Sequence, residues 1–290
     1  MKRILKWIGI IIGGIILLLL IIGLTIFMNG KSKLGGSFDV AHSLGTIAAD
    51  SSQLVRGEYL AHIVSRCTGC HSDQFEGRIL IDDAAFGLIP APNLTSGKGG
   101  IGGHYQDADW EGAIRHGVGM DDRVLVGMPS EFFTVYGDKD LKSLIAFLKT
   151  LPAVENELPQ RELGPMAYLL IGTGMYEPPA IALDHEEVHD SAPEAAVDAA
   201  YGEYLVNLVA CGECHGATLH GPEFTGPPPG PDLSPEGNLR EWTEDDFVLT
   251  LRSGTTPDGR ILDSEIMPWP RMSRMSDLEL KAIWRYLQNI

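Results

Sequence analysis

The chain has 290 residues, enough for two domains of ordinary size, and 44% of them are hydrophobic, as in a folded protein. Its formal net charge of −17 disfavours nucleic acid and anionic lipid as partners and suits a basic protein partner. Solubility alone is the simpler explanation of this charge.

The first predicted element is a long apolar stretch over Ile4–Met28. As a helix, its roughly 25 residues extend about 37 Å, more than the ~30 Å hydrocarbon core of a bilayer. The alternative is a secretory signal peptide, but such a peptide has a shorter apolar region and a small-x-small cleavage site, and no obvious site follows here. We therefore predict a transmembrane anchor over residues 1–28. Lys2, Arg3 and Lys6 orient its start towards the cytoplasm, which places the rest on the periplasmic side of the cytoplasmic membrane.

A flexible tether and then a helix are expected after the anchor. Residues 29–50 are rich in Gly, Ser and other small side chains, a composition typical of a flexible linker. Apolar residues at helical spacing then run from Leu54 to Val64, and Ser51 or Ser52 can cap the start of this helix.

The sequence Cys-x-x-Cys-His occurs twice, and Gly-Glu-Tyr-Leu precedes it both times. The motif residues are Cys67, Cys70 and His71 in the first copy and Cys211, Cys214 and His215 in the second. Two disulfides, two redox motifs or a zinc site are alternatives for four cysteines, but none of them needs a His directly after both second cysteines. Cys-x-x-Cys-His is the attachment signature of haem c, in which the thiols form thioethers and the His ligates iron. Two copies predict two covalently bound haem c groups.

The two copies keep matching downstream of the motif. The matched pairs are Pro92 and Pro231, Trp110 and Trp242, Arg115 and Arg252, and Met128 and Met267. Each copy ends with an amphipathic helix, which begins near Leu141 or Leu280, and Asp138 and Ser276 are plausible N-caps. A repeat of about 100 residues is a duplication of a whole domain rather than a solenoid.

This duplication predicts two tandem haem-binding domains, residues 51–154 and 196–290, joined by an interdomain linker over 155–195. The linker contains the apolar run Leu163–Tyr176, which is too short and too interrupted by Gly and Pro to span a membrane. Packing at the domain interface is its expected role, and a membrane-surface or partner-docking patch is the alternative.

The final helices are expected to cross the first helices closely. Gly57 and Gly202 stand at the same point of the two first helices, and Phe147 and Tyr286 are in register on the final ones. A Gly allows close approach of a crossing helix and an aromatic side chain can fill the gap.

Each repeated residue has a predicted role at its haem. His71 and His215 are proximal iron ligands, and the backbone carbonyl of Pro92 or Pro231 can accept a hydrogen bond from the other ring nitrogen. The attachment cysteines and these residues together form the predicted cofactor-binding site.

A soft sixth iron ligand suits a haem that only passes electrons, and a Met thioether raises the reduction potential relative to a second His. Met128 and Met267 are the predicted ligands because each stands before a Pro at the matched position. Met120 is the alternative in the first copy. Met272 and Met275 are weaker alternatives in the second.

Trp and Arg residues are predicted to contact the haem propionates. The indole N–H of Trp110 or Trp242 can donate to a propionate, although packing in the core explains these side chains equally well. Arg115 and Arg252 can pair with propionates, and solvated surface arginine is the simpler alternative.

These motifs resemble class I c-type cytochromes and, more closely, the multihaem cytochrome subunits of membrane-bound alcohol and aldehyde dehydrogenases. The resemblance covers about residues 51–290 and also includes Ile-Arg-His-Gly at 114–117. It implies small all-α haem domains that relay electrons from a dehydrogenase donor to quinone, a cytochrome or a terminal oxidase of the respiratory chain. This chain has two motifs where that subunit usually has three, and it has an N-terminal anchor.

The predicted function is therefore electron transfer by a membrane-anchored dihaem cytochrome c between extracytoplasmic redox partners, without catalysis by the chain itself. The alternative is a dihaem peroxidase-like enzyme, which needs one iron with a displaceable sixth ligand and acid–base groups over it. The two matched Met-Pro pairs argue against it. A passive docking subunit of a respiratory complex is a third interpretation.

Overall fold

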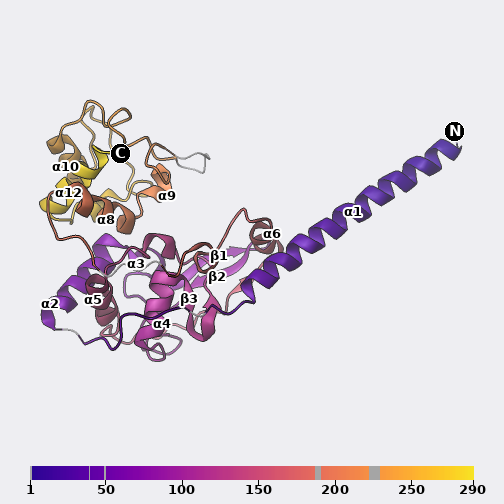
Figure 1. Ribbon diagram of the computed structural model, residues 1–290, viewed down its shortest axis with the longest axis horizontal. Helices are drawn as coiled ribbons and strands as arrows, with labels where there is room; N and C mark the ends of the chain where they lie inside the picture. The colour runs from indigo at the N-terminus through magenta and orange to yellow at the C-terminus, as the bar shows by residue number, and fades with distance from the viewer. Residues whose placement is uncertain (1, 39, 49, 187–190, 222–228) are drawn as a thin grey trace.

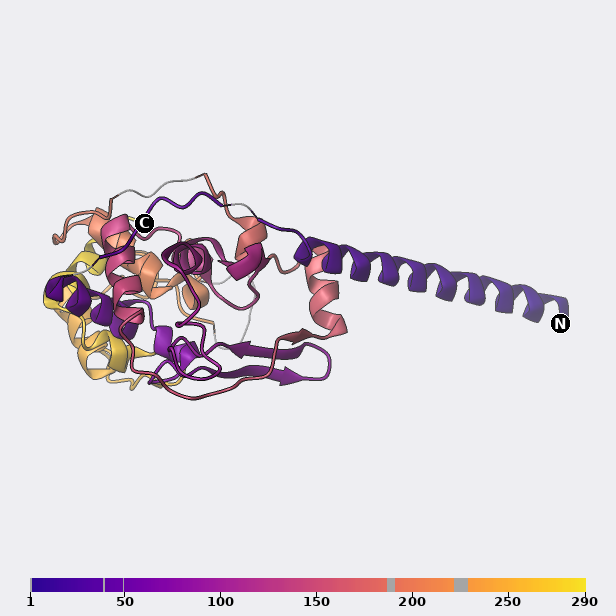
Figure 2. The ribbon, with the colours of Figure 1, turned by 90° about the horizontal axis from the view of Figure 1, so that it is seen from below.

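The computed structural model describes residues 2–38, 40–48, 50–186, 191–221 and 229–290 (Figure 1). About half of the chain is helical, which confirms the expected helical character. A long N-terminal helix projects from a globular part made of two lobes, and Figure 2 shows the same projection from a second direction.

The helices divide between the lobes as the order of the chain suggests. The projecting helix of Figure 1 is α1 (Lys2–Leu34). The first lobe and the segment after it contain α2 (Ser51–Tyr59), α3 (Cys67–His71), α4 (Asp107–Glu111), α5 (Asp138–Leu148), α6 (Pro165–Thr173) and α7 (Pro179–Ala182). Shorter turns of this lobe are π-helical η1 (Leu60–Val64) and η2 (Gly112–His116) and 3-10 η3 (Met120–Asp122) and η4 (Ser130–Phe132). The second lobe contains α8 (Ala199–Val209), α9 (Gly212–His215), α10 (Glu244–Ser253), α11 (Trp269–Met272) and α12 (Asp277–Leu287).

Short strands in the first lobe depart from the all-α prediction. The antiparallel strands β1 (Arg78–Asp83) and β2 (Gly87–Ala91) form a hairpin, and β5 (Glu162–Leu163) pairs with β2 to give the order β1-β2-β5. A second pair joins β3 (Val118–Gly119) to β4 (Arg123–Val124). The reason for the hairpin is local: its first strand is rich in branched residues, which favour extended backbone.

Helix α1 is almost wholly exposed and apolar. Within the described residues it is the one helix long and apolar enough to cross a membrane. It continues past the predicted anchor to Leu34 without a break.

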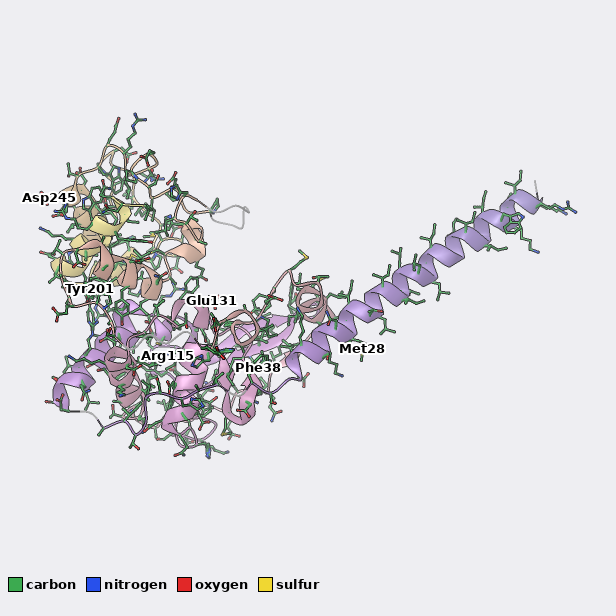
Figure 3. All side chains as sticks on the ribbon, viewed as in Figure 1. Met28, Phe38, Arg115, Glu131, Tyr201 and Asp245 are labelled. Carbon is green, nitrogen blue, oxygen red and sulfur yellow. The ribbon has the colours of Figure 1, made fainter. Side chains whose placement is uncertain are left out.

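The segment over 29–50, which was predicted to be a flexible tether, begins with the end of α1 and makes defined contacts in its described residues. Leu34 and Phe38 pack against a small cluster of buried residues that includes Val118 and Val124, and Figure 3 marks Phe38 near the end of α1. Further along, the backbone N–H of Ile47 donates to the Asp107 carboxylate at 2.8 Å. Composition alone predicted flexibility because it gave no sign of these contacts.

The apolar run Leu163–Tyr176 does not lie at the interface between the lobes, contrary to the expectation. It forms β5 and then α6, and α6 packs against the end of α1 (Figures 1 and 2). The rings of Phe27 and Tyr168 meet edge to face at 5.0 Å between centroids, and Asn29 Nδ2 donates to the Gly172 carbonyl oxygen at 2.8 Å.

The close crossing of first and final helices is confirmed in both lobes. A Cβ added to Gly57 would lie 2.0 Å from the Ser143 carbonyl oxygen, and one added to Gly202 would lie 2.0 Å from that of Ala282. The added Cβ atoms would also lie 2.7 Å from the Phe147 Cβ and 2.8 Å from the Tyr286 Cβ, respectively. A side chain at either Gly would therefore force the helices apart.

The helix starts were predicted correctly in one case and wrongly in two. Ser276 caps α12, where its side chain accepts from the Glu279 backbone and Glu279 reaches back. The cap of α2 is Asp50, one residue before the expected serines, and its carboxylate accepts from the Ser52 and Gln53 backbone. Helix α5 has Gly137 rather than Asp138 at its N-cap.

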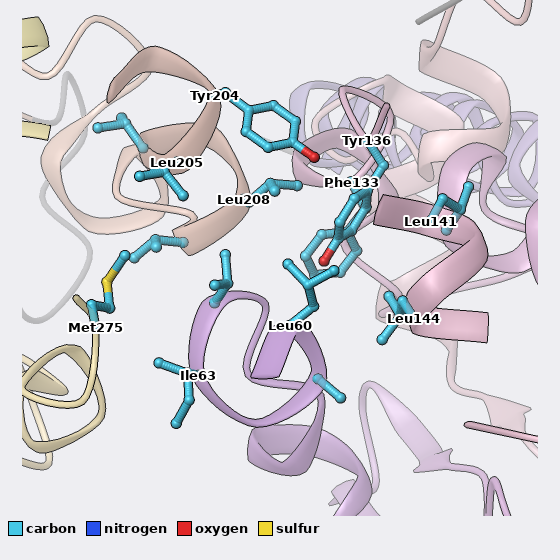
Figure 4. Packing of buried hydrophobic residues seen from close by; sticks show 14 of the residues in the cluster. Leu60, Ile63, Phe133, Tyr136, Leu141, Leu144, Tyr204, Leu205, Leu208 and Met275 are labelled. Carbon is cyan, nitrogen blue, oxygen red and sulfur yellow. The ribbon is translucent and has the colours of Figure 1, made fainter. Parts of the chain in front are cut away.

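The two lobes share one continuous hydrophobic core, shown from close by in Figure 4. Leu60 and Ile63 of the first lobe face Leu205, Leu208 and Met275 of the second. The interface therefore includes the helical segments that lead into both Cys-x-x-Cys-His motifs.

Candidate functional site

The two Cys-x-x-Cys-His motifs follow the same backbone path. The residue before each first cysteine has a left-handed conformation, with φ of 47° at Arg66 and 62° at Ala210. A short helix, α3 or α9, then carries the motif. In both copies the carbonyl oxygen of the motif His accepts from a Gly six residues on, at 2.8 Å from Gly77 and 2.9 Å from Gly221. Non-Gly residues rarely adopt positive φ, so its recurrence at one position marks a required bend.

The motif histidines are held in matching environments. His71 Nδ1 lies 2.8 Å from the Pro92 carbonyl oxygen, and His215 Nδ1 lies 2.7 Å from that of Pro231. Both rings are buried, and burial lowers the pKa of each, so the imidazoles are neutral at pH 7. A neutral imidazole that donates through Nδ1 has its Nε2 lone pair available for iron. The ligand role itself stays a prediction.

All four cysteines are free thiols, so the disulfide alternative has no support in this structure. Burial raises the pKa of Cys67 to about 12 and that of Cys211 to about 11, and both thiols are therefore neutral at pH 7. In the described part of the chain, no group of three or more His, Cys, Asp and Glu side chains gathers as a zinc site requires.

Both predicted Met ligands stand at the same bend. Met128 and Met267 are partly buried against the core, and each carbonyl oxygen accepts from the backbone N–H two residues later. The next residue in each case is the Pro at the N-cap of a short helical turn, η4 or α11. Met120 is likewise partly buried, whereas Met272 and Met275 are almost fully buried. Ligation by Met128 and Met267 remains a prediction.

Trp110 fits the predicted contact better than Trp242. The Trp110 side chain is 2% exposed, and its buried Nε1 has no hydrogen-bond partner in the protein. A buried N–H without an acceptor is costly, and a haem propionate would satisfy it. Trp242 instead precedes Thr243, the N-cap of α10, and it is partly buried. Phe247 takes the helix position that corresponds to Trp110, five residues before the repeated Arg.

The repeated arginines bind protein groups instead of facing open space. The terminal nitrogens of Arg115 donate to Glu111 and to Asp138 at 3.1 and 3.0 Å, which leaves only its buried Nε without a partner. Arg252 donates to the Ser273 carbonyl oxygen and to Asp277. A haem propionate could therefore pair only with N–H groups of these arginines that do not already donate to the protein, and this pairing stays a prediction.

Arg271 is a candidate that the sequence analysis missed. It lies close to Cys67 and to Cys211, donates to the Val64 carbonyl oxygen at 2.8 Å, and has a buried Nε without a partner. Burial lowers its pKa to about 10, so it remains a cation at pH 7. The copies give no signal for it, since Phe132 stands at the matching position after Met-Pro.

The contacts around Arg271 have a counterpart on the other side of the interface. Phe132 of η4 lies 3.9 Å from where a Gly212 Cβ would be, inside the second attachment motif. Each Met-Pro turn therefore touches the attachment segment of the other copy. The attachment segments of both candidate haem sites therefore lie at the interface between the lobes.

The tyrosine of each Gly-Glu-Tyr-Leu segment donates a hydrogen bond across that interface to an acidic side chain of the other lobe. Tyr59 donates to the Glu279 carboxylate of α12, and Tyr204 donates to the Asp140 carboxylate of α5 at 2.9 Å. Glu279 and Asp140 occupy matching positions, two residues before the same Lys. Arg56 binds Asp140 at 2.8 Å and lies 3.7 Å from Glu279, which joins the two exchanged pairs. This exchange gives the repeated tyrosine the same role in both copies.

The residues present fit haem c. Each copy offers two thiols, a neutral imidazole oriented by a carbonyl oxygen, and a Met on a Pro-fixed turn. The unpartnered N–H groups of Trp110 and Arg115 are suited to carboxylates such as propionates.

Comparisons with known proteins agree with this chemistry. The chain is similar to the fructose dehydrogenase cytochrome subunit of Gluconobacter japonicus, 26% identical over 84% of this chain and 54% of the relative. It is similar to the gluconate 2-dehydrogenase cytochrome c subunit of Pantoea cypripedii, 29% identical over 83% of this chain and 60% of the relative. A third relative, a diheme cytochrome c-type protein of Cereibacter sphaeroides, is 27% identical over 77% of this chain and 81% of that protein.

The chain spans between half and two thirds of the length of the dehydrogenase subunits it matches. No family model matches it. The similarity bears out the resemblance to cytochrome subunits of dehydrogenases and supports an electron-transfer cytochrome c. The names of these relatives give no support to the peroxidase-like alternative.

Proposed function

We propose that this chain is a membrane-anchored dihaem cytochrome c that relays electrons between redox partners on the periplasmic side of the cytoplasmic membrane. Two tandem haem domains, residues 51–154 and 196–290, would each bind one haem c covalently. The segment over 155–195 connects them. The chain itself would not transform a substrate.

One observation carries this proposal: the two Cys-x-x-Cys-His motifs share one backbone path and one His–Pro hydrogen bond. In this arrangement Cys67, Cys70 and His71 hold the first haem, and Cys211, Cys214 and His215 hold the second. Such a bound haem supplies one-electron redox chemistry. The Pro92 and Pro231 carbonyls fix the tautomer and orientation of the two imidazoles.

The lobe interface supports direct transfer between the two sites. Arg271 touches the first attachment segment, and Phe132 approaches the second. Burial of the interface excludes water, which keeps reorganisation on electron transfer small. Met128 and Met267 complete the proposed ligand sets, with Trp110, Trp242, Arg115 and Arg252 as proposed propionate contacts.

The partners follow from the relatives and from charge. The relatives' names indicate a dehydrogenase as the electron donor, and a cytochrome or oxidase of the respiratory chain is the proposed acceptor. The net charge of −17 suits a basic surface on at least one of them.

The haem count tests this proposal directly. The full chain is produced with a cytochrome maturation system, and haem is quantified after extraction with acidified acetone. We expect two haems per chain to resist extraction, and one in each of the double variants Cys67→Ala with Cys70→Ala and Cys211→Ala with Cys214→Ala, because each double variant lacks both thioether bonds to one haem. Fewer than two in the unaltered chain would refute the proposal.

The sixth ligands are tested by spectroscopy of the loaded protein. We expect two low-spin irons by EPR and loss of one His/Met signal in Met128→Ala and in Met267→Ala. Met120→Ala is the matched control for the first site. A lost signal in Met120→Ala but not in Met128→Ala would reassign the ligand, and a high-spin iron in the unaltered chain would favour an enzyme.

A further inference from the structure

The junction of α1 and α6 joins the globular part rigidly to the anchor helix. The backbones touch, since a Cβ added to Gly30 would lie 2.0 Å from the Tyr168 carbonyl oxygen, and one added to Gly172 would lie 2.0 Å from that of Ile26. Lys33 Nζ and Glu177 Oε1 form an ion pair at 3.0 Å. The backbone contacts converge on one crossing point of Gly30 and Gly172, and Figure 2 shows α6 lying across α1 there. The Lys33–Glu177 pair then places the segment after α6 beside the C-terminal end of α1.

This crossing point gives the depth of α6 relative to a bilayer. The hydrocarbon core of ~30 Å takes about 20 helical residues, and the apolar part of α1 ends at Met28, before Asn29 and Lys31. Gly172 packs against the helical turn Ile26–Gly30, which includes the end of the apolar part, and is therefore level with the edge of the hydrocarbon. Figure 3 marks Met28 on α1 beside this junction.

The surface of α6 and the turn after it is unusually apolar for a surface facing water. Met175 at the turn is 78% exposed, Met166 is 41% exposed and Tyr176 is 37% exposed. Phe86, at the tip of the β1–β2 hairpin, is exposed beside the start of α6, where its carbonyl oxygen accepts from Gly164. Aromatic and apolar side chains at this level are typical of the membrane–water interface.

Cationic side chains lie one turn further from the hydrocarbon. Lys31 and Arg161 line an open pocket of about 480 Å³ between α1, β5 and α6, together with Tyr168 and Glu162. Lys31 is about 6 Å beyond Phe27 along the helix, within the ~5–7 Å headgroup layer on each side of the core. Phosphate groups of phospholipids lie at this depth and attract such cations.

We propose that α6 and the turn over residues 174–176, which we call the shoulder, lie in the surface of the phospholipid bilayer and hold the globular part at a fixed tilt. This rests on the proposed anchoring by α1. The acidic remainder of the protein faces away from the lipid. The second lobe then lies on the side remote from the exit of α1 (Figures 1 and 2).

Thiol accessibility in vesicles tests the shoulder. In the loaded chain the four native cysteines are blocked by thioether bonds, so an introduced cysteine is the one reactive thiol. Met175→Cys is compared with Leu249→Cys, an exposed apolar position of α10 (61%) in the second lobe. Each variant is reconstituted in phosphatidylcholine vesicles and treated with a membrane-impermeant maleimide, and rates are normalised to the denatured protein.

We expect labelling at position 175 to be at least tenfold slower than at position 249. Equal rates would overturn the proposal, because both side chains are exposed in the protein alone. Leu17→Cys, in the middle of α1, separates the two hypotheses. Rapid labelling there shows that anchoring itself fails, whereas protection at 17 with rapid labelling at 175 refutes the shoulder alone. An unchanged haem absorption spectrum verifies the fold of each variant.

Discussion

Arg271 shows how one side chain can influence both candidate sites. It is a cation at pH 7, partly removed from water, and it lies close to Cys67 and Cys211. A nearby positive charge stabilises the reduced form of a haem, because reduction removes one positive charge from the iron. Its effect is expected at both sites because it stands between them.

Replacing Arg271 tests this electrostatic role. Arg271→Leu should lower the reduction potentials of the loaded protein, on the order of tens of millivolts, because the buried positive charge is lost. Spectroelectrochemical titration measures the shift. Arg260→Leu removes an exposed arginine of the same lobe and is the matched control. Equal potentials in the two variants would contradict the assigned role.

Comparison of the two copies in the sequence identified some residues of the candidate sites and could not identify others. Pro92 and Pro231 were assigned to the motif histidines because they recur, and the contact is present in both copies, although the ligand roles stay predictions. Arg271 has no counterpart, so comparison of the copies could not reveal it. Trp242 was matched to Trp110 by residue type, whereas the spacing to the following Arg differs.

At the scale of elements, the helix crossings depend on two glycines. Gly57 and Gly202 bring α2 against α5 and α8 against α12 with backbone contact. Their place on the helices made the crossings predictable from sequence. The pairing of β5 with β2 and the course of α6 were not predictable in the same way, because both depend on contacts between residues distant in the chain.

A methyl group at one crossing should be enough to destabilise the protein. Gly202→Ala should reduce the free energy of unfolding by roughly 1–3 kcal/mol, because its Cβ would collide with the Ala282 carbonyl oxygen. Denaturant titration measures the change. Gly103→Ala is the control, since a Cβ there meets nothing closer than 3.8 Å. An unchanged free energy for Gly202→Ala would show that the helices can separate freely.

The turn η2 contains a buried histidine that makes the fold sensitive to acid. The Nδ1 atoms of His116 and His185 lie 3.1 Å apart, and Arg115 and His42 are also near His116. Burial, followed by the charges of these neighbours, lowers the pKa of His116 to about 4. The folded protein therefore resists protonation of this ring.

The sign of the resulting pH dependence follows from the lowered pKa. Between pH 6.5, the ordinary pKa of His, and pH 4, His116 binds a proton in the unfolded chain but not in the folded one. The free energy of unfolding should therefore fall as pH drops from about 6.5 towards 4. His116→Gln should reduce this fall, and His104→Gln, at an exposed position, should not. Equal slopes in denaturant titrations across this window would contradict the assignment.

At the scale of the whole molecule, the two lobes are joined by exchanged hydrogen bonds. Tyr59 of the first lobe reaches Glu279, and Tyr204 of the second reaches Asp140. Burial raises the pKa of both phenols, so they remain donors at any ordinary pH. These two bonds and the shared hydrophobic core of Figure 4 hold the lobes together, and we call this connection the joint.

Removing both hydroxyls should weaken the joint while leaving each lobe intact. A hydrogen bond to a charged group contributes about 1.5–3 kcal/mol, so the variant Tyr59→Phe with Tyr204→Phe should unfold at a lower temperature and in two steps. Calorimetry of the loaded protein measures this. Tyr286→Phe, whose ring packs within one lobe, is the control. A single unshifted transition in the double variant would argue against the joint.

The organisation into two halves was predictable because the sequence repeats, but the way the halves meet was only partly visible. The tyrosines and acids were present at matched positions, yet their exchange depends on the relative placement of the lobes. The last part of α1 was assigned to a linker because small residues, which predict a linker, also fit where backbones pass closely, as at Gly30.

The exchanged tyrosine–acid bonds have an evolutionary consequence. A half of this chain carries both members of the exchange, a donor on its first helix and an acceptor on its last. Two identical copies of one half would therefore satisfy each other across a twofold axis, as in an isologous dimer. Duplication and fusion of a half that associates with itself would leave this symmetric exchange within one chain, and Arg271 and Phe132, which differ at matched positions, would be later departures from the symmetry.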